Sequence, residues 1–183
     1  MIRLVPETVR GLSLEQYDFL VAAGQLDGER VELLEGELVS VPPISPEHAS
    51  TVDKLADLLR AQLPAGWRVR AQSPLAVPPG SEPEPDVAVV PDGDYDHQHP
   101  RTALLVVEVS VSTPRTDLDV KAAVYAAAGV AEYWVVDIAA RVGHVHRAVT
   151  AGGYGVVTEY EGVLRSRTEP AFAVDLRDVL PRG

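Results

Sequence analysis

Two acidic residues and one lysine are spaced so that folding could bring them into one cation-binding group. Asp86 opens an apolar run that continues to Val90, and Glu108 lies near the end of a second apolar run, residues 104–109. Lys121 follows in a segment with helical spacing. Two carboxylates at the ends of neighbouring strands, with an ammonium nearby, could hold a divalent cation and serve phosphate chemistry.

The surroundings expected for Glu108 also call for a positive charge. Unbroken apolar character over residues 104–109 is typical of a strand covered on both faces, so Glu108 should lie at the end of a buried element. An unpaired carboxylate there would be costly. A structural salt bridge or a hydrogen-bonded strand end would satisfy this requirement as well as a metal would. The prediction of a site therefore depends on Asp86 and Lys121.

Lysine usage draws attention to Lys121. Of the 16 basic residues only Lys54 and Lys121 are lysines, and the other 14 are arginines. A lysine retained in such a chain suggests a task for a compact ammonium beside a reacting oxygen, which the planar guanidinium of arginine performs poorly.

Other polar residues are weaker candidates, and each has a simpler interpretation. Glu32 could be a solvated acid on a hairpin arm, and His48 a surface or capping residue. Asp117, Lys121 and Tyr125 are four residues apart on one helical face, which is also the pattern of an ordinary surface ion pair. The aspartates and histidines of residues 91–101 match no ion-binding loop and are interpreted as a solvated loop.

The elements that must position these residues can be predicted from periodicity and breakers. We expect a parallel pairing between the strands on either side of the Lys121 helix, a covering hairpin after them, and weak signals over 161–183. The expected helices are 12–23, 47–63, a segment from Thr116 or Asp117 to Ala128, and a short one at 176–180. The expected strands are 67–71, 85–90, 104–109, 132–137, 141–148 and 154–160, with a hairpin over 29–41.

Composition limits the class of protein. The chain has 183 residues, 46% of them hydrophobic, which predicts one α/β domain over 1–183 with a substantial core. It has no cysteine, no apolar stretch long enough to span a membrane and no signal-peptide core after Met1, so we expect a cytoplasmic protein with no membrane partner. The net charge of −11 argues against broad attraction to nucleic acid.

The ordered motifs resemble a known group of proteins. Pro85-Asp86 followed by Glu108-Val109-Ser110 resembles the PD-(D/E)XK nuclease superfamily. The chain is more closely similar to the bacterial Uma-type family of restriction-endonuclease-like proteins, through the hairpin 32–38, His48 and an ordered series after the central strand. That series is Glu108, Ser110, Ser112, Thr113, Asp117 or Asp119, Lys121, Tyr125, Gly129, Val130, Glu132, Tyr133, Trp134 and Asp137.

The resemblance implies a restriction-endonuclease-like fold, a mixed sheet flanked by helices with an αβββαβ core. It also implies that Asp86, Glu108 and the backbone carbonyl of Val109 hold Mg²⁺ or Mn²⁺. Ser110 stands where the superfamily has its motif lysine, and Lys121 takes over that function from the following helix. Glu32 joins the catalytic group, and the further candidates are His48, Ser110, Asp117 and Tyr125.

The function implied by the resemblance is a metal-dependent endonuclease that hydrolyses DNA phosphodiester bonds. A homodimer would suit the cutting of both strands. Two alternatives stay open at this stage. One is a nuclease-fold binding module with weak or no catalysis, which the net charge favours, and the other is a hydrolase of another phosphate ester.

Overall fold

The computed structural model describes residues 11–111, 116–168 and 170–182, without the side chains of Thr116 and Asp117. Six strands form one mixed sheet in the order β3-β4-β5-β6-β7-β8, in which only β5 and β6 are parallel neighbours. The strands are β3 (Trp67–Ala71), β4 (Val87–Pro91), β5 (Leu105–Ser110), β6 (Glu132–Asp137), β7 (Val142–Thr150) and β8 (Gly153–Tyr160).

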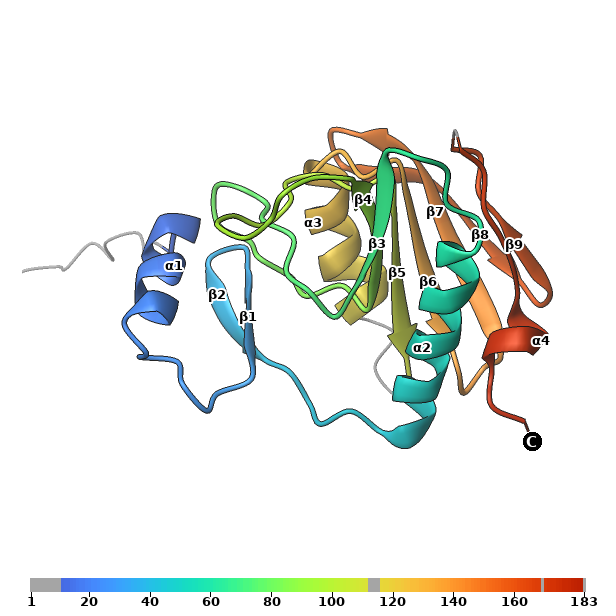
Figure 1. Ribbon diagram of the computed structural model, residues 1–183, viewed down its shortest axis with the longest axis horizontal. Helices are drawn as coiled ribbons and strands as arrows, with labels where there is room; N and C mark the ends of the chain where they lie inside the picture. The colour runs from blue at the N-terminus through green and yellow to red at the C-terminus, as the bar shows by residue number, and fades with distance from the viewer. Residues whose placement is uncertain (1–10, 112–115, 169, 183) are drawn as a thin grey trace, which may run out of the picture.

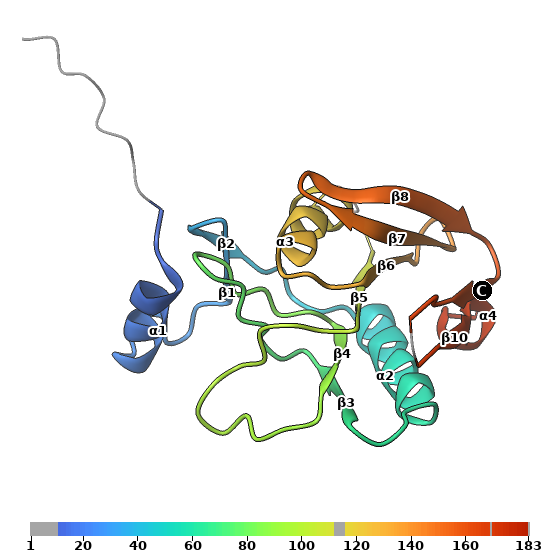
Figure 2. The ribbon, with the colours of Figure 1, turned by 90° about the horizontal axis from the view of Figure 1, so that it is seen from above.

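Helices cover the two faces of this sheet (Figures 1 and 2). The helix α2 (Pro46–Arg60) lies on one face with the short helix α4 (Leu176–Val179) and the two-stranded sheet of β9 (Val163–Arg165) and β10 (Ala173–Asp175). On the other face lies α3 (Ala122–Ala127), which continues from the π-helix η1 (Thr116–Lys121). Every residue of β5 is buried, because the strand lies at the centre of these layers.

A hairpin and a helix stand at one end of the sheet. The hairpin pairs β1 (Val31–Leu34) with β2 (Glu37–Ser40), and α1 (Leu14–Ala22) lies beside it, away from the main sheet (Figure 1). α1 begins with a capping box between Ser13 and Gln16. α2 begins with a capping serine and a proline, since the Ser45 side chain accepts from the His48 N–H at 3.2 Å and Pro46 is the first helical residue.

The order α2-β3-β4-β5-α3-β6 confirms the predicted αβββαβ core and the parallel crossover. Two other predictions are wrong. β7 and β8 do not cover the sheet but extend it beyond β6, because the β6 backbone still has a free edge there. The segment before Lys121 is π-helical where an α-helix was expected. The extent of the domain over 1–183 remains a prediction.

Residues 161–175 contribute more structure than their weak sequence signal indicates. Leu164 in β9 and Phe172, just before β10, lie in the core under the sheet, where neither is more than 2% exposed. Strands of three residues are too short to show an alternating pattern, so sequence periodicity misses them. No helix among the described residues has the length and apolar character needed to cross a membrane.

The contact between β7 and β9 should be sensitive to one added methyl group. A Cβ on Gly143 would lie 2.7 and 2.8 Å from the two terminal carbons of Leu164, which is fully buried, so the Leu164 side chain would have to shift within the core. We expect Gly143→Ala to lower the free energy of unfolding by about 1–3 kcal/mol in a urea titration. Gly152→Ala is the matched control, because its added Cβ would meet nothing within 4 Å. Equal stabilities of the two variants would contradict this packing.

The loop before β4 should make stability depend on pH through Glu82. This carboxyl group is 7% exposed, and burial, followed by the nearby Asp18 and Glu84, raises its pKa from 4.5 to about 7. Between these values the folded chain binds more protons than the unfolded chain, so stability falls as the pH rises from about 4.5 to about 7.

Glu82→Gln removes this titration. We therefore expect the stability of Glu82→Gln relative to wild type to rise across that pH window and to level off above it. Urea titrations at several pH values measure the difference, and the exposed Glu37→Gln gives the baseline. A difference between Glu82→Gln and wild type that stays constant from pH 4 to pH 8 would contradict the shifted pKa.

Candidate active site

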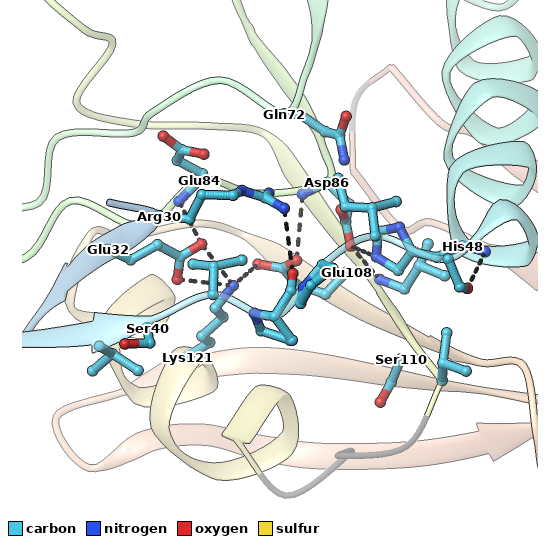
Figure 3. Close-up of a pocket in the computed structure, with 18 of the residues that line it drawn as sticks. Arg30, Glu32, Ser40, His48, Gln72, Glu84, Asp86, Glu108, Ser110 and Lys121 are labelled. Carbon is cyan, nitrogen blue, oxygen red and sulfur yellow. Dashed lines mark hydrogen bonds and ion pairs between the residues drawn. The ribbon is translucent and has the colours of Figure 1, made fainter. Parts of the chain in front are cut away.

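A cleft of about 680 Å³ lies at the end of β5, between the β1–β2 hairpin and the start of α2 (Figure 3). The segment that joins β2 to α2, residues 41–45, forms one wall. The charged and polar residues that line the cleft are Arg30, Glu32, Ser40, Ser45, His48, Gln72, Glu84, Asp86, Glu108, Ser110 and Lys121.

Asp86 and Glu108 continue the pairing of β4 and β5 with their side chains. The backbone ladder ends at the pair Val87 and Val107. One residue further on, the Val109 N–H donates to Asp86 Oδ2 at 2.8 Å and the Asp86 N–H donates to Glu108 Oε2 at 3.3 Å. Each carboxylate therefore takes the place of a backbone carbonyl, which satisfies buried N–H groups and fixes both side chains at the edge of the cleft.

Glu108 accepts hydrogen bonds on both of its oxygens. Besides the Asp86 N–H, Lys121 Nζ donates to Oε1 at 3.0 Å and the Tyr125 hydroxyl donates to the same oxygen at 2.6 Å. Burial, and then the Glu108 charge, raise the pKa of Tyr125 well above its usual value, so the hydroxyl keeps its proton. Glu108 is only 2% exposed, and these donors offset the cost of burying its charge.

Lys121 joins the central strand to the hairpin. Its ammonium lies 3.0 Å from Glu108 Oε1 and 3.2 Å from Glu32 Oε2, with Glu32 Oε1 also at 3.2 Å. Glu32 Oε1 accepts a further bond from the Glu84 N–H at 3.1 Å. Glu32 is 4% exposed and Lys121 is 9% exposed, so neither belongs to a solvated surface pair.

Of the three residues expected to share one helical face, two can be compared, Lys121 and Tyr125. Lys121 ends the π-helix and Tyr125 lies in the α-helix after it, and both reach Glu108. The side chain of Asp117 and the motif residues Ser112 and Thr113 lie outside the described part of the structure.

The remaining candidates lie around the same cleft. His48, in the first turn of α2, has Nε2 3.1 Å from Asp86 Oδ2, so it contacts the proposed metal ligand from the opposite wall. Ser110 is 3% exposed and lines the cleft, but its Oγ has no hydrogen-bond partner within the described residues. At the position of the superfamily's motif lysine, the Ser110 side chain thus makes no hydrogen bond with the described residues, and the ion pairs of the site are made by Lys121.

The cleft carries an excess of negative charge. Four carboxylates and only two permanently cationic side chains, Arg30 and Lys121, are among its lining residues. Burial, followed by the Glu32 charge, raises the pKa of Glu84, while Arg30 and Lys121 act in the opposite direction. A cation would balance this excess charge.

Sequence reasoning misses three contributors to the cleft. Arg30, Glu84 and Gln72 line it, and none of them lies in a recognisable motif. Gln72 follows β3 with a positive φ of 46°, and its N–H donates to the Asp86 carbonyl at 3.1 Å. The short distance in sequence from Arg30 to Glu32 is the one signal that could have indicated Arg30.

The fold places the chain in a known class of structures. It is similar to a crystal structure described as "a putative nuclease belonging to DUF820", from Anabaena variabilis ATCC 29413. The TM-score is 0.71, the similarity covers 92% of this chain and 97% of that chain, and the sequence identity is 11%. The mixed sheet flanked by helices is thus a nuclease-like fold.

Family membership follows from the sequence. The model of the Uma2 family, described as "Putative restriction endonuclease", matches residues 14–180, so the chain belongs to this family. The resemblance seen in the sequence motifs is confirmed. No curated protein matches the chain in sequence.

The Lys121 bridge should contribute strongly to folding. Lys121→Met would leave two buried carboxylates, Glu32 and Glu108, without their cation, and breaking a buried pair in this way costs about 3–5 kcal/mol. Adding Glu32→Gln should recover part of that loss, because one uncompensated charge is removed. Urea titrations of the single and double variants measure both effects.

The other lysine provides the control. Among the described residues Lys54 Nζ donates to the Val179 carbonyl alone, at 3.4 Å, so Lys54→Met should cost about 1 kcal/mol or less. A similar loss in Lys54→Met and Lys121→Met, or no recovery in the double variant, would show that the bridge has no special contribution.

Proposed function

We propose that this chain is a divalent-metal-dependent endonuclease that hydrolyses DNA phosphodiester bonds. The observation that supports it best is the meeting of Asp86, Glu108 and Lys121 at one edge of the cleft. Asp86 immediately precedes β4, Glu108 lies in β5 and Lys121 ends η1. Membership of the Uma2 family and the nuclease-like fold agree with this proposal.

The donor atoms at this edge suit a hard cation. Asp86 and Glu108 offer carboxylate oxygens, and Asp86 Oδ1 accepts no hydrogen bond from the described residues. Among all the described residues, no three His, Asp or Glu side chains are arranged to hold one ion. Mg²⁺ commonly takes one or two carboxylates and completes its shell with water and phosphate, so a pair can suffice.

Asp86, Glu108 and the carbonyl of Val109 would hold Mg²⁺ or Mn²⁺. The ion would supply Lewis acidity and lower the pKa of the attacking water. Lys121 orients that water and stabilises negative charge on the phosphate. Glu32 holds the lysine from the side opposite Glu108, and the Tyr125 hydroxyl holds the Glu108 carboxylate. His48 fixes the Asp86 carboxylate and lines the path of the phosphate.

A second function, a nuclease-fold module that binds without catalysis, is favoured by one observation. Both Glu108 oxygens already accept hydrogen bonds, and the Lys121 charge is matched by two carboxylates. A site that keeps this arrangement in solution would bind nucleic acid or a partner without an ion. Isothermal titration with Mn²⁺ separates the two functions, since the module predicts no binding at millimolar concentration.

Replacement of one ligand should weaken metal binding and slow cleavage. We expect Asp86→Asn to weaken Mn²⁺ binding and to slow nicking of supercoiled plasmid in Mg²⁺ by about 100-fold, because a neutral amide is a poor ligand for a hard cation. Excess EDTA should abolish cleavage by wild type. The control is Asp92→Asn, because the Asp92 carboxylate pairs with Arg68 at 2.9 Å and lies outside the cleft.

Lys121→Met, assayed at a temperature where it remains folded, should bind Mn²⁺ but cleave no plasmid. Wild-type rates in Asp86→Asn or in Lys121→Met would remove that residue from the mechanism. A folded wild type that cleaves neither plasmid nor linear DNA in Mg²⁺ or Mn²⁺ would overturn the proposed activity.

A further inference from the structure

The cleft needs a cation that can meet a phosphate, and Lys121 is poorly placed to be the main one. Its ammonium is 9% exposed and lies between two carboxylates, Glu32 and Glu108. The local charge of that group is negative before any ion binds. An approaching phosphate would therefore meet net repulsion at this point.

Arg30 is the other permanently cationic residue that lines the cleft, and it is exposed. Among the described residues it forms no ion pair within 4.0 Å. Its charge acts on Glu84, whose pKa it lowers, but that carboxylate is itself exposed at the mouth of the cleft. Arg30 thus retains positive charge on a wall that solutes can reach.

The side chain of Arg30 is also held in place. Its Nη1 donates to the Pro42 carbonyl at 3.3 Å, and its own backbone carbonyl accepts from the Val41 N–H at 2.8 Å. Both partners belong to the proline-containing linker between β2 and α2. Figure 3 shows the side chain extending along the cleft from the Glu84 side toward Asp86, above Lys121 and Glu108. One hydrogen bond to a carbonyl leaves most of the five guanidinium donors without a partner among the described residues, on a side chain that lines the cleft.

We propose that Arg30 binds a backbone phosphate of the nucleic acid through its guanidinium group, beside the scissile bond. The planar fork can donate two parallel hydrogen bonds to the non-bridging oxygens of one phosphate. The contact reads no base, so it positions the strand without regard to sequence. This inference rests on the proposed nuclease function and adds an exposed, permanent positive charge to the wall of an acidic cleft.

Salt dependence of DNA binding tests the contact directly. The probe is a fluorescein-labelled 20-base-pair duplex, with Ca²⁺ in place of Mg²⁺ to prevent turnover, and anisotropy is measured from about 50 to 200 mM KCl. We expect Arg30→Gln to weaken binding about tenfold at the lowest salt and to reduce the slope of log K against log [KCl] by about one. Arg30→Lys should keep the slope and recover part of the affinity.

The control variant is Arg60→Gln. Arg60 is an exposed arginine at the end of α2 that pairs with Asp57 at 3.1 Å and does not line the cleft. We expect it to bind and to cleave as wild type does. In Mg²⁺, Arg30→Gln should lower kcat/KM for plasmid nicking by about 10- to 100-fold, because charge developing on the phosphate loses one donor.

The outcomes separate this inference from the proposed activity. If wild type cleaves DNA, and Arg30→Gln cleaves at the same rate with the same salt slope, Arg30 binds no phosphate although the nuclease function stands. If wild type binds DNA with an Arg30-dependent slope but cleaves nothing, the phosphate contact stands and the activity fails. Equal losses in Arg30→Gln and Arg60→Gln, or no DNA binding by wild type, would overturn the contact.

Discussion

The buried ion bridge from Glu32 through Lys121 to Glu108 is the interaction on which the rest of the site depends. It joins three elements, β1, η1 and β5, that are far apart in the chain, and it does so where every partner is at least nine-tenths buried. Removing the Lys121 charge would leave both carboxylates without compensation in a poorly solvated place. The hairpin, which shares no strand pairing with the main sheet, is thereby held over the cleft. Folding and assembly of the candidate active site are the same event.

Asp86 and Glu108 likewise contribute both to the fold and to the candidate site. Both carboxylates accept backbone N–H groups at the point where β4 and β5 cease to pair, so each has a structural function besides the one proposed in catalysis. The sheet gives the two side chains a fixed separation that a loop could not. Arg30 differs, because it is exposed and held by a single side-chain bond to the linker. Core residues of the cleft set its shape, and its rim is where contact with a long polyanion would be made.

Much of this arrangement could be predicted from the sequence. The unbroken apolar run of β5 indicated a buried central strand, and the family motifs indicated that Asp86, Glu108 and Lys121 belong together. The sequence could not show that Lys121 ends a π-helix, because a segment of six residues is too short for its hydrophobic spacing to distinguish a π-helix from an α-helix. It also could not show that β7 and β8 extend the sheet. A half-exposed hairpin has the same alternation whether it covers a face or lengthens an edge. Arg30 was missed since its function depends on a wall built by distant residues.

The hydrogen bond that the Val109 N–H donates to Asp86 has a consequence for evolution within the family. A lineage that no longer cut DNA would still need a carboxylate at this position to terminate the strand pair, and a lysine to neutralise the acids beside it. Purifying selection on folding would preserve the signature of a nuclease in descendants that had lost the chemistry. Retention of these residues in a relative is therefore weak evidence of catalysis. Retention of an arginine at position 30, which is exposed, would be stronger evidence that the relative still binds phosphate.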